Sequence, residues 1–241
     1  MIRRVLAQTR VEIVLTLRRG ESLLVVAGIP VGILVFFTAV DVLPHGAGRA
    51  VDFLVPGVLA LSVISSAMTS LGIATGFERH SGVLRRLGLT PLGREGLLIA
   101  KAVSILVVVS LQVVAVGVVG AGLGWRSSGS VAASISIVAL GVVTFAGLGL
   151  LLAGRLRAEM NLAVTNALFL VFLLLGGIVV PLSELPDGLA AAAGILPAEP
   201  FASALRSSLL GASVAVADLA TLGAWALGSC GLAAVTFRWE S

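Results

Sequence analysis

The sequence is poor in the residues on which soluble enzymes depend. Its 241 residues include no tyrosine, one cysteine, two histidines and one lysine. Charged residues make up 12% of the chain, half of the ~25% typical of soluble domains. Hydrophobic residues make up 58%, and the mean hydropathy is +1.13. The single cysteine, Cys230, excludes an intrachain disulfide. This composition indicates a protein that lies largely within a membrane.

Nucleotide-binding and catalytic motifs are also missing. A P-loop needs a lysine that neutralises nucleotide phosphates within a glycine-rich motif, but the only lysine lies in the segment Ile99-Ala100-Lys101-Ala102. Neither His45 nor His80 lies in an apolar segment where it could activate a serine. No His, Cys and Asp cluster has metal-ligand spacing. We therefore expect no catalytic residue, no metal site and no bound cofactor in this chain. Because the arginines form no continuous basic face, nucleic acid is not an expected partner.

Six apolar segments are long enough to cross a bilayer as helices, which takes about 20 residues. They cover residues 23–40, 53–77, 97–124, 130–153, 161–180 and 218–237. Backbone groups cannot remain unpaired in lipid, so each segment is predicted to be helical. The expected fold class is an all-α integral membrane protein with six transmembrane helices, forming a single transmembrane domain over residues 1–241.

The arginines predict the orientation of these spans. Twelve of them fall in the N-terminal segment, after the second span, after the fourth span and at the C-terminus. Three fall on the other side, namely Arg49, Arg126 and Arg206. Cytoplasmic segments are enriched in Lys and Arg, so both termini are predicted to be cytoplasmic.

Two segments outside the spans have patterns of their own. Residues 2–19 place an apolar stripe beside several arginines, which predicts an amphipathic helix on the inner membrane surface; a simple basic tail is the alternative. Residues 181–217, on the external side, are broken by four prolines into the short apolar pieces 189–196 and 201–210. These pieces are too short to span, so we expect a re-entrant or interfacial hairpin before the last span.

A charged segment, residues 78–95, separates the second span from the third. It begins with Glu78 and Arg79, and residues 81–89 can form two helical turns. Thr90 and Pro91 are expected to end these turns, because the residue before a proline disfavours the helical conformation.

Neutral polar side chains are found inside two of the spans. The second span has Ser62, Ser66, Thr69 and Ser70 near one face, and the fifth has Asn161, Thr165 and Asn166 near its inner end. Hydroxyl groups commonly pack helices together in membranes. The functional alternative is a weakly polar path for an amphipathic substrate. Its candidate residues are Ser62, Ser66, Thr69, Ser70, Thr165 and Asn166.

The order of these features resembles the permease subunits of type-two ABC exporters, in particular daunorubicin-type drug-resistance permeases. The first motif is Glu78-Arg79-x-x-Gly82-x-Leu84-x-Arg86-Leu87-x-x-Thr90-Pro91. The second runs from Leu174-Leu175-Gly176-Gly177-Ile178 through Pro181-Leu182-Ser183-Glu184-Leu185-Pro186 to Leu196-Pro197. The resemblance covers nearly the whole chain, without a large extracellular domain.

The resemblance implies a bacterial inner-membrane exporter of hydrophobic drugs or lipid-like molecules. Residues 78–95 would form a coupling helix that docks on a separate ABC ATP-binding subunit, present in two copies and holding ATP and Mg. A second permease, identical or paralogous, would complete the complex. The implied coupling residues are Glu78, Arg79, Gly82, Leu84, Arg85, Arg86, Leu87, Thr90 and Pro91. Alternatively, these arginines only fix the topology.

Two other functional classes remain open from the sequence. A stand-alone six-helix channel or secondary carrier would show flux from this chain alone. A membrane enzyme or scaffold is the third class, although no catalytic constellation can be assembled.

Overall fold

The computed structural model describes residues 6–11, 14, 20–40, 49–89 and 93–237, and every regular element in these ranges is helical. Residues 6–11 are helical, and the rest of the predicted amphipathic helix 2–19 lies largely outside the described residues. The helices that follow are α2 (Gly20–Val40), α3 (Ala50–Ile64), the π-helix η1 (Ser65–Ser70), α4 (Leu71–His80), α5 (Val83–Gly88), α6 (Gly93–Gly122), α7 (Val131–Arg155), α8 (Ala158–Leu175), the 3-10 turn η2 (Leu182–Glu184), α9 (Asp187–Ile195), α10 (Ala198–Leu209) and α11 (Val216–Thr236).

Among the described residues, five helical segments are long and apolar enough to cross a membrane, and they coincide with five of the six predicted spans. They are Ala50–His80, Ile99–Gly122, Val131–Arg155, Ala158–Leu175 and Val216–Thr236. The first predicted span falls in α2, where Gly28–Val40 forms a shorter apolar helix. The second span is longer than predicted, because α3, η1 and α4 are continuous through His80. The first residues of the charged segment are therefore the last turn of this helix rather than part of a loop.

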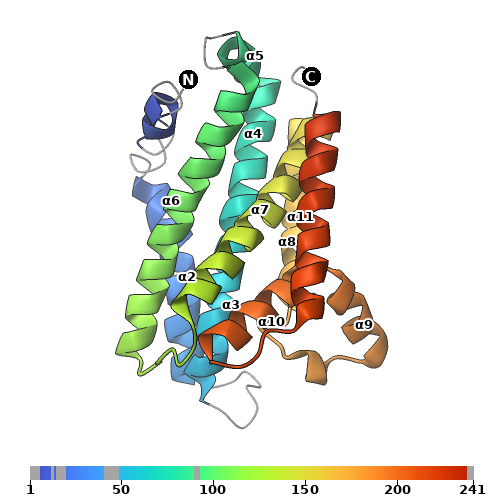
Figure 1. The fold of residues 1–241 in the computed structure, drawn as a ribbon. Coiled ribbons are helices and arrows are strands. Elements are labelled where there is room, and N and C mark those ends of the chain that lie inside the picture. The colour runs from blue at the N-terminus through green and yellow to red at the C-terminus, as the bar shows by residue number, and fades with distance from the viewer. Residues whose placement is uncertain (1–5, 12–13, 15–19, 41–48, 90–92, 238–241) are drawn as a thin grey trace.

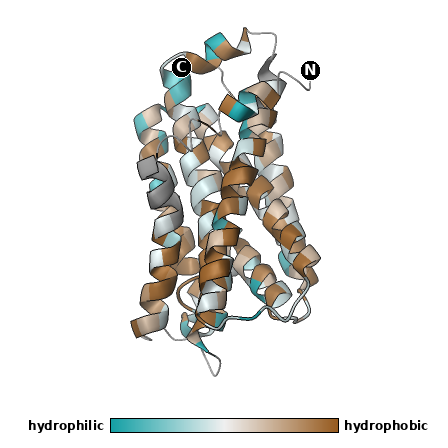
Figure 2. Cartoon of the chain, turned by 90° about the vertical axis from the view of Figure 1, so that its left-hand side faces the viewer, coloured by the Kyte–Doolittle hydropathy of each residue, from teal (hydrophilic) through white to brown (hydrophobic). Residues whose placement is uncertain are grey.

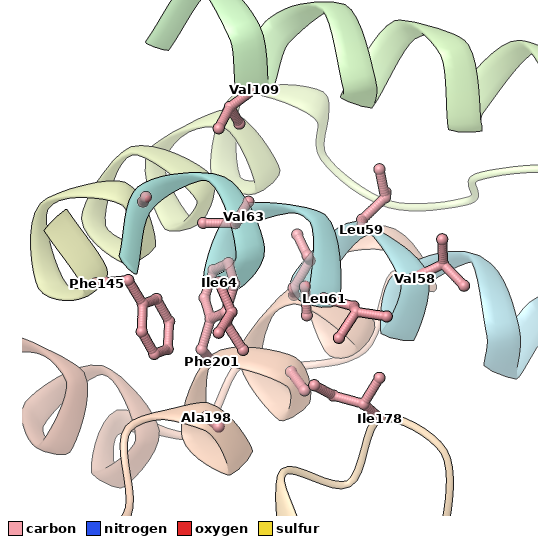
Figure 3. Close-up of a cluster of buried hydrophobic side chains, with 14 of the residues drawn as sticks. Val58, Leu59, Leu61, Val63, Ile64, Val109, Phe145, Ile178, Ala198 and Phe201 are labelled. Carbon is pink, nitrogen blue, oxygen red and sulfur yellow. The ribbon is translucent and has the colours of Figure 1, made fainter. Parts of the chain in front are cut away.

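The helix formed by α3, η1 and α4 is the axis of the bundle. In its apolar stretch 89% of the residues are buried, against 22% in the apolar stretches of α8 and of α11. Its first part, α3, packs on α2, α6 and α10, whereas its last part, α4, packs on α7 and α8. Figure 3 shows Ile64 of α3 beside Phe145 of α7 and Phe201 of α10. The two phenylalanine rings meet edge to face, with their centroids 5.6 Å apart.

The predicted external hairpin contains the two helices α9 and α10, which correspond to the predicted pieces 189–196 and 201–210. The chain bends by 83° between them. Helix α10 buries Phe201 and Leu205 in the bundle core. Its Arg206 donates from Nη2 to the Gly177 carbonyl at 2.8 Å and lies 4.3 Å above the Phe53 ring. The polar side of α10 is thus bound to the end of α8 and the start of α3.

The two ends of the bundle differ. Helix α5 and the described residues nearest both chain termini lie at one end, and α9 and α10 lie toward the other (Figure 1). Hydrophobic residues predominate along the long helices, and hydrophilic residues gather near the end that carries α5 (Figure 2). At the opposite end, Arg49 donates to both carboxylate oxygens of Asp52, at 2.9 and 3.0 Å. These hydrogen bonds and the charge of Asp52 raise the pKa of Arg49.

Candidate functional site

A tight reversal joins α4 to α5. Gly82 has φ 73°, a left-handed conformation that glycine adopts without the penalty paid by other residues. The Phe77 carbonyl at the end of α4 accepts both the Ser81 backbone N–H and the Ser81 hydroxyl, each at 2.9 Å. Helix α5 covers Val83–Gly88, within the predicted 81–89. Thr90 and Pro91, predicted to end it, lie outside the described residues.

The side chains of α5 separate into a buried side and an exposed side. Leu84 is 1% exposed and lies against the bundle. Arg85 and Arg86 are exposed, as are the apolar Val83 and Leu89. We call these four residues the outer face of α5. Leu84, one of the implied coupling residues, packs α5 onto its own chain. Leu89 was not among the coupling residues predicted from the sequence, although it lies four residues after Arg85.

The first two residues of the charged segment point into the bundle. Arg79 is 5% exposed, and its Nη1 donates to the Gly154 carbonyl of α7 at 2.7 Å. Its Nη2 donates to the carbonyl of Leu156, just after α7. The Glu78 carboxylate pairs with the buried ammonium of Lys101 in α6 at 2.6 Å. Glu78 and Arg79 therefore join α4 to α6 and α7, and they lie apart from the outer face of α5.

Several of the polar residues predicted inside the spans are bonded within the chain. Ser62 donates to the Val58 carbonyl at 2.8 Å within its own helix. Ser66 donates to Oε1 of Gln112 in α6 at 2.9 Å, and Thr165 donates to Oδ1 of Asn161 at 3.3 Å. All these side chains are buried. The sequence did not predict Gln112 as a partner of Ser66, because a single polar residue in an apolar run forms no recognisable pattern.

The other predicted path residues are more accessible. Ser70 and Asn166 are exposed, and Thr69 is partly buried. Residues 65–70 form a π-helix, whose wider turn displaces later side chains around the axis from their α-helical positions. The structure thus divides the predicted serine and threonine face between the interior and the surface.

These observations define a multi-pass α-helical membrane protein that carries a short helix at one end of the bundle. The family model for the ABC-2 type transporter matches residues 4–210, and the chain belongs to this family. The predicted resemblance to type-two ABC permeases is confirmed.

Two curated relatives, one from Escherichia coli strain K12 and one from Escherichia coli O157:H7, carry the name "Probable multidrug ABC transporter permease YbhS". Each is 30% identical to this chain over 173 residues, which are 68% of the chain and 44% of the relative. The chain therefore spans less than half the length of these relatives.

Proposed function

We propose that this chain is the membrane-spanning subunit of an ATP-driven exporter that moves a hydrophobic or amphipathic substrate, such as a drug or lipid, out of the cytoplasm. Membership of the ABC-2 type transporter family supports this proposal. The observation that carries it is the outer face of α5, where two arginines and two apolar side chains are exposed beyond the end of the second span. ATP and Mg are bound by a separate subunit, which docks on this face.

The outer face of α5 suits a cleft that is apolar at its centre and acidic at its edges. Val83 and Leu89 supply apolar area, and Leu89 is 82% exposed. Arg85 and Arg86 supply positive charge for complementarity, which guides association and selects the partner. The buried Leu84 and the turn at Gly82 hold this face in a fixed position on the bundle.

The orientation follows from the same docking face. An ATP-binding subunit works in the cytoplasm, so the end of the bundle that carries α5 is placed on the cytoplasmic side of a bacterial inner membrane. The described residues nearest both termini share that end (Figure 1), in agreement with the distribution of arginines. Helices α9 and α10 then form the external re-entrant hairpin. Two ATP-binding subunits and a second permease, identical or paralogous, complete the transporter.

The substrate path is proposed to follow the polar residues on the accessible sides of η1 and α8. Ser70 and Asn166 are exposed, and Thr69 is partly buried with its hydroxyl oxygen turned away from solvent. Ser66 helps to fix the wall of this path, because its hydroxyl donates to Gln112 of α6. Ser62 and Thr165 contribute as part of that wall, and their hydroxyls donate within their own helices.

Charge reversal on α5 tests the docking. Arg85→Glu combined with Arg86→Glu places like charges against an acidic cleft, and we expect affinity for the ATP-binding subunit to fall at least ~10-fold. The measurements are co-purification of that subunit, vesicle ATPase activity and ATP-dependent transport of daunorubicin, a fluorescent amphipathic drug. Arg155→Glu with Arg157→Glu is the matched control, since both arginines are exposed in the α7–α8 connection.

The alternative roles of the arginines and of the chain predict different results in the same assays. If the arginines only fix topology, the two double variants behave alike and the subunit still co-purifies with both. A channel or carrier gives daunorubicin flux in liposomes that contain this chain alone and no ATP. Unchanged assembly and transport after reversal at Arg85 and Arg86 refutes the docking assignment.

A further inference from the structure

Arg79 joins the end of α4 to the end of α7. The last carbonyls of a helix have no partner within that helix, and the C-terminal end carries partial negative charge. Arg79 supplies a cation and two donors there, to the carbonyls of Gly154 and Leu156. The side chain is 5% exposed, so this contact lies inside the protein. Because Arg79 lies three residues before Gly82, the contact is next to the turn into α5.

Asn161 makes a second connection, from the start of α8 to α4. Its side chain is fully buried, and Nδ2 donates to the Gly72 carbonyl at 2.9 Å. Position 76 of α4 has room for this amide only because it is glycine: a Cβ at Gly76 would lie 2.5 Å from Nδ2. Thr165 donates to Oδ1 and fixes the amide from the other side.

A third contact brings the backbones of α4 and α7 together. A Cβ at Gly72 would lie 3.0 Å from the Cα and the carbonyl oxygen of Gly149. Positions 72, 76 and 79 follow the i, i+4, i+7 spacing and share one side of α4. From Gly72 to Arg79, this side of α4 therefore contacts α7 and α8, by close backbone packing at Gly72 and by hydrogen bonds from Asn161 and from Arg79.

We infer that Arg79 and Asn161 are positioning residues that transmit a displacement of α5 to the inner ends of α7 and α8. The inference rests on the proposed function, in which α5 receives the motion of an ATP-binding subunit. When the ATP-binding subunit displaces α5, α4 moves with α5. Arg79 and Asn161 then displace α7 and α8 together with α4. In this role Arg79 acts within the chain, and docking depends on Arg85 and Arg86.

The alternative is that both contacts only stabilise the bundle, as polar side chains do between membrane helices. A stabilising contact and a transmitting contact differ in what their removal does to motion. Loss of a stabilising contact lowers stability while the assembled complex still works. Loss of a transmitting contact lets α5 move without α7 and α8.

The test uses the full chain in nanodiscs with the ATP-binding subunit that co-purifies with it. Spin labels on cysteines replacing the exposed His80 and Arg157, in a Cys230→Ser background, report the distance between the end of α4 and the α7–α8 connection. This distance should stay the same with and without ATP in the otherwise unchanged protein. In Arg79→Ala and in Asn161→Leu it should change when ATP is added.

Transport gives the second readout. With assembly and ATPase activity retained, daunorubicin transported per ATP should fall roughly 10-fold in both variants, within the 5- to 150-fold range of coupling between sites. Arg79→Lys keeps the charge but not the forked pair of donors and should restore coupling in part. Ser208→Ala is the matched control, because it removes the buried 2.9 Å hydrogen bond to Ser134 in the outer half of the bundle. It should lower stability and leave transport per ATP unchanged.

The inference is overturned if Asn161→Leu and Arg79→Lys assemble and keep both the ATP-independent distance and the normal transport per ATP. It is also overturned if ATP changes the distance in the protein with Arg79 and Asn161 intact. If no ATP-binding subunit associates with the chain, the proposed function itself fails, and the inference fails with it. The distance readout holds whether or not daunorubicin is carried.

Discussion

The contact between η1 and α7 gives the sharpest prediction about stability. A Cβ at Gly149 would lie 2.6 Å from the Met68 carbonyl oxygen and 3.1 Å from the Met68 Cα. Both atoms belong to the backbone, so no side chain can rotate away to make room. Gly149→Ala must therefore push α7 away from the central helix. Met68, fully buried at this crossing, would lose packing.

The size of the effect follows from two opposing contributions. Overpacking a well-packed interior costs about 1–3 kcal/mol, and replacing a helical glycine by alanine returns about 0.5–1 kcal/mol. We expect Gly149→Ala to lower the free energy of unfolding by roughly 1–2 kcal/mol. Gly117→Ala in α6 is the matched control, because nothing beyond its chain neighbours and its own helix backbone lies within 4 Å of its Cβ position. It should be neutral or raise stability by up to ~1 kcal/mol.

The assay is equilibrium unfolding of the purified chain in mixed micelles with a rising fraction of SDS, followed by tryptophan fluorescence. The contrast between the two variants is the informative quantity, since both make the same chemical change in a membrane helix. If Gly149→Ala is as stable as Gly117→Ala, the backbone contact between η1 and α7 does not exist as described. A large loss in both variants would show instead that alanine is poorly tolerated at these positions for another reason.

Two further predictions concern an ion pair between α4 and α6 and an exposed amide on α8. Glu78→Gln removes the carboxylate that faces the buried Lys101 ammonium at 2.6 Å. Removing one partner of a fully buried pair costs about 3–5 kcal/mol, and because 28% of the Glu78 side chain is exposed, we expect a smaller loss of stability in the same unfolding assay. Most of this loss should be recovered in the double variant Glu78→Gln with Lys101→Met, and equal stability of the single variant and the unchanged protein would contradict the pairing. Asn166→Leu replaces an exposed amide on α8, so stability should change by less than ~0.5 kcal/mol while daunorubicin transport changes several-fold. Unaltered transport in Asn166→Leu would remove this residue from the proposed path.

Much of the architecture could be read from the sequence because it depends on local properties. The length of an apolar run decides whether it can cross a bilayer, and in the described part of the chain five of the six predicted spans coincide with helices of sufficient length and apolarity. The prolines between 181 and 200 interrupt the external segment at fixed points, and α9 and α10 lie close to the predicted pieces. The motif around Gly82 pointed to the family, and the Thr90-Pro91 pair after residues 81–89 pointed to a short helix, because the residue before a proline disfavours the helical conformation.

The tertiary structure alone decided which residues of the charged segment face outward. Sequence placed Glu78, Arg79, Leu84 and Arg85 in one segment, but the direction of each side chain depends on where α4 ends and how α5 folds back. Arg79 is buried because the carbonyls at the end of α7 accept its donors, and Gly154 is 75 residues away in the chain. Asn161 meets Gly72 across 89 residues. Such contacts arise from the packing of distant helices, which no local pattern records.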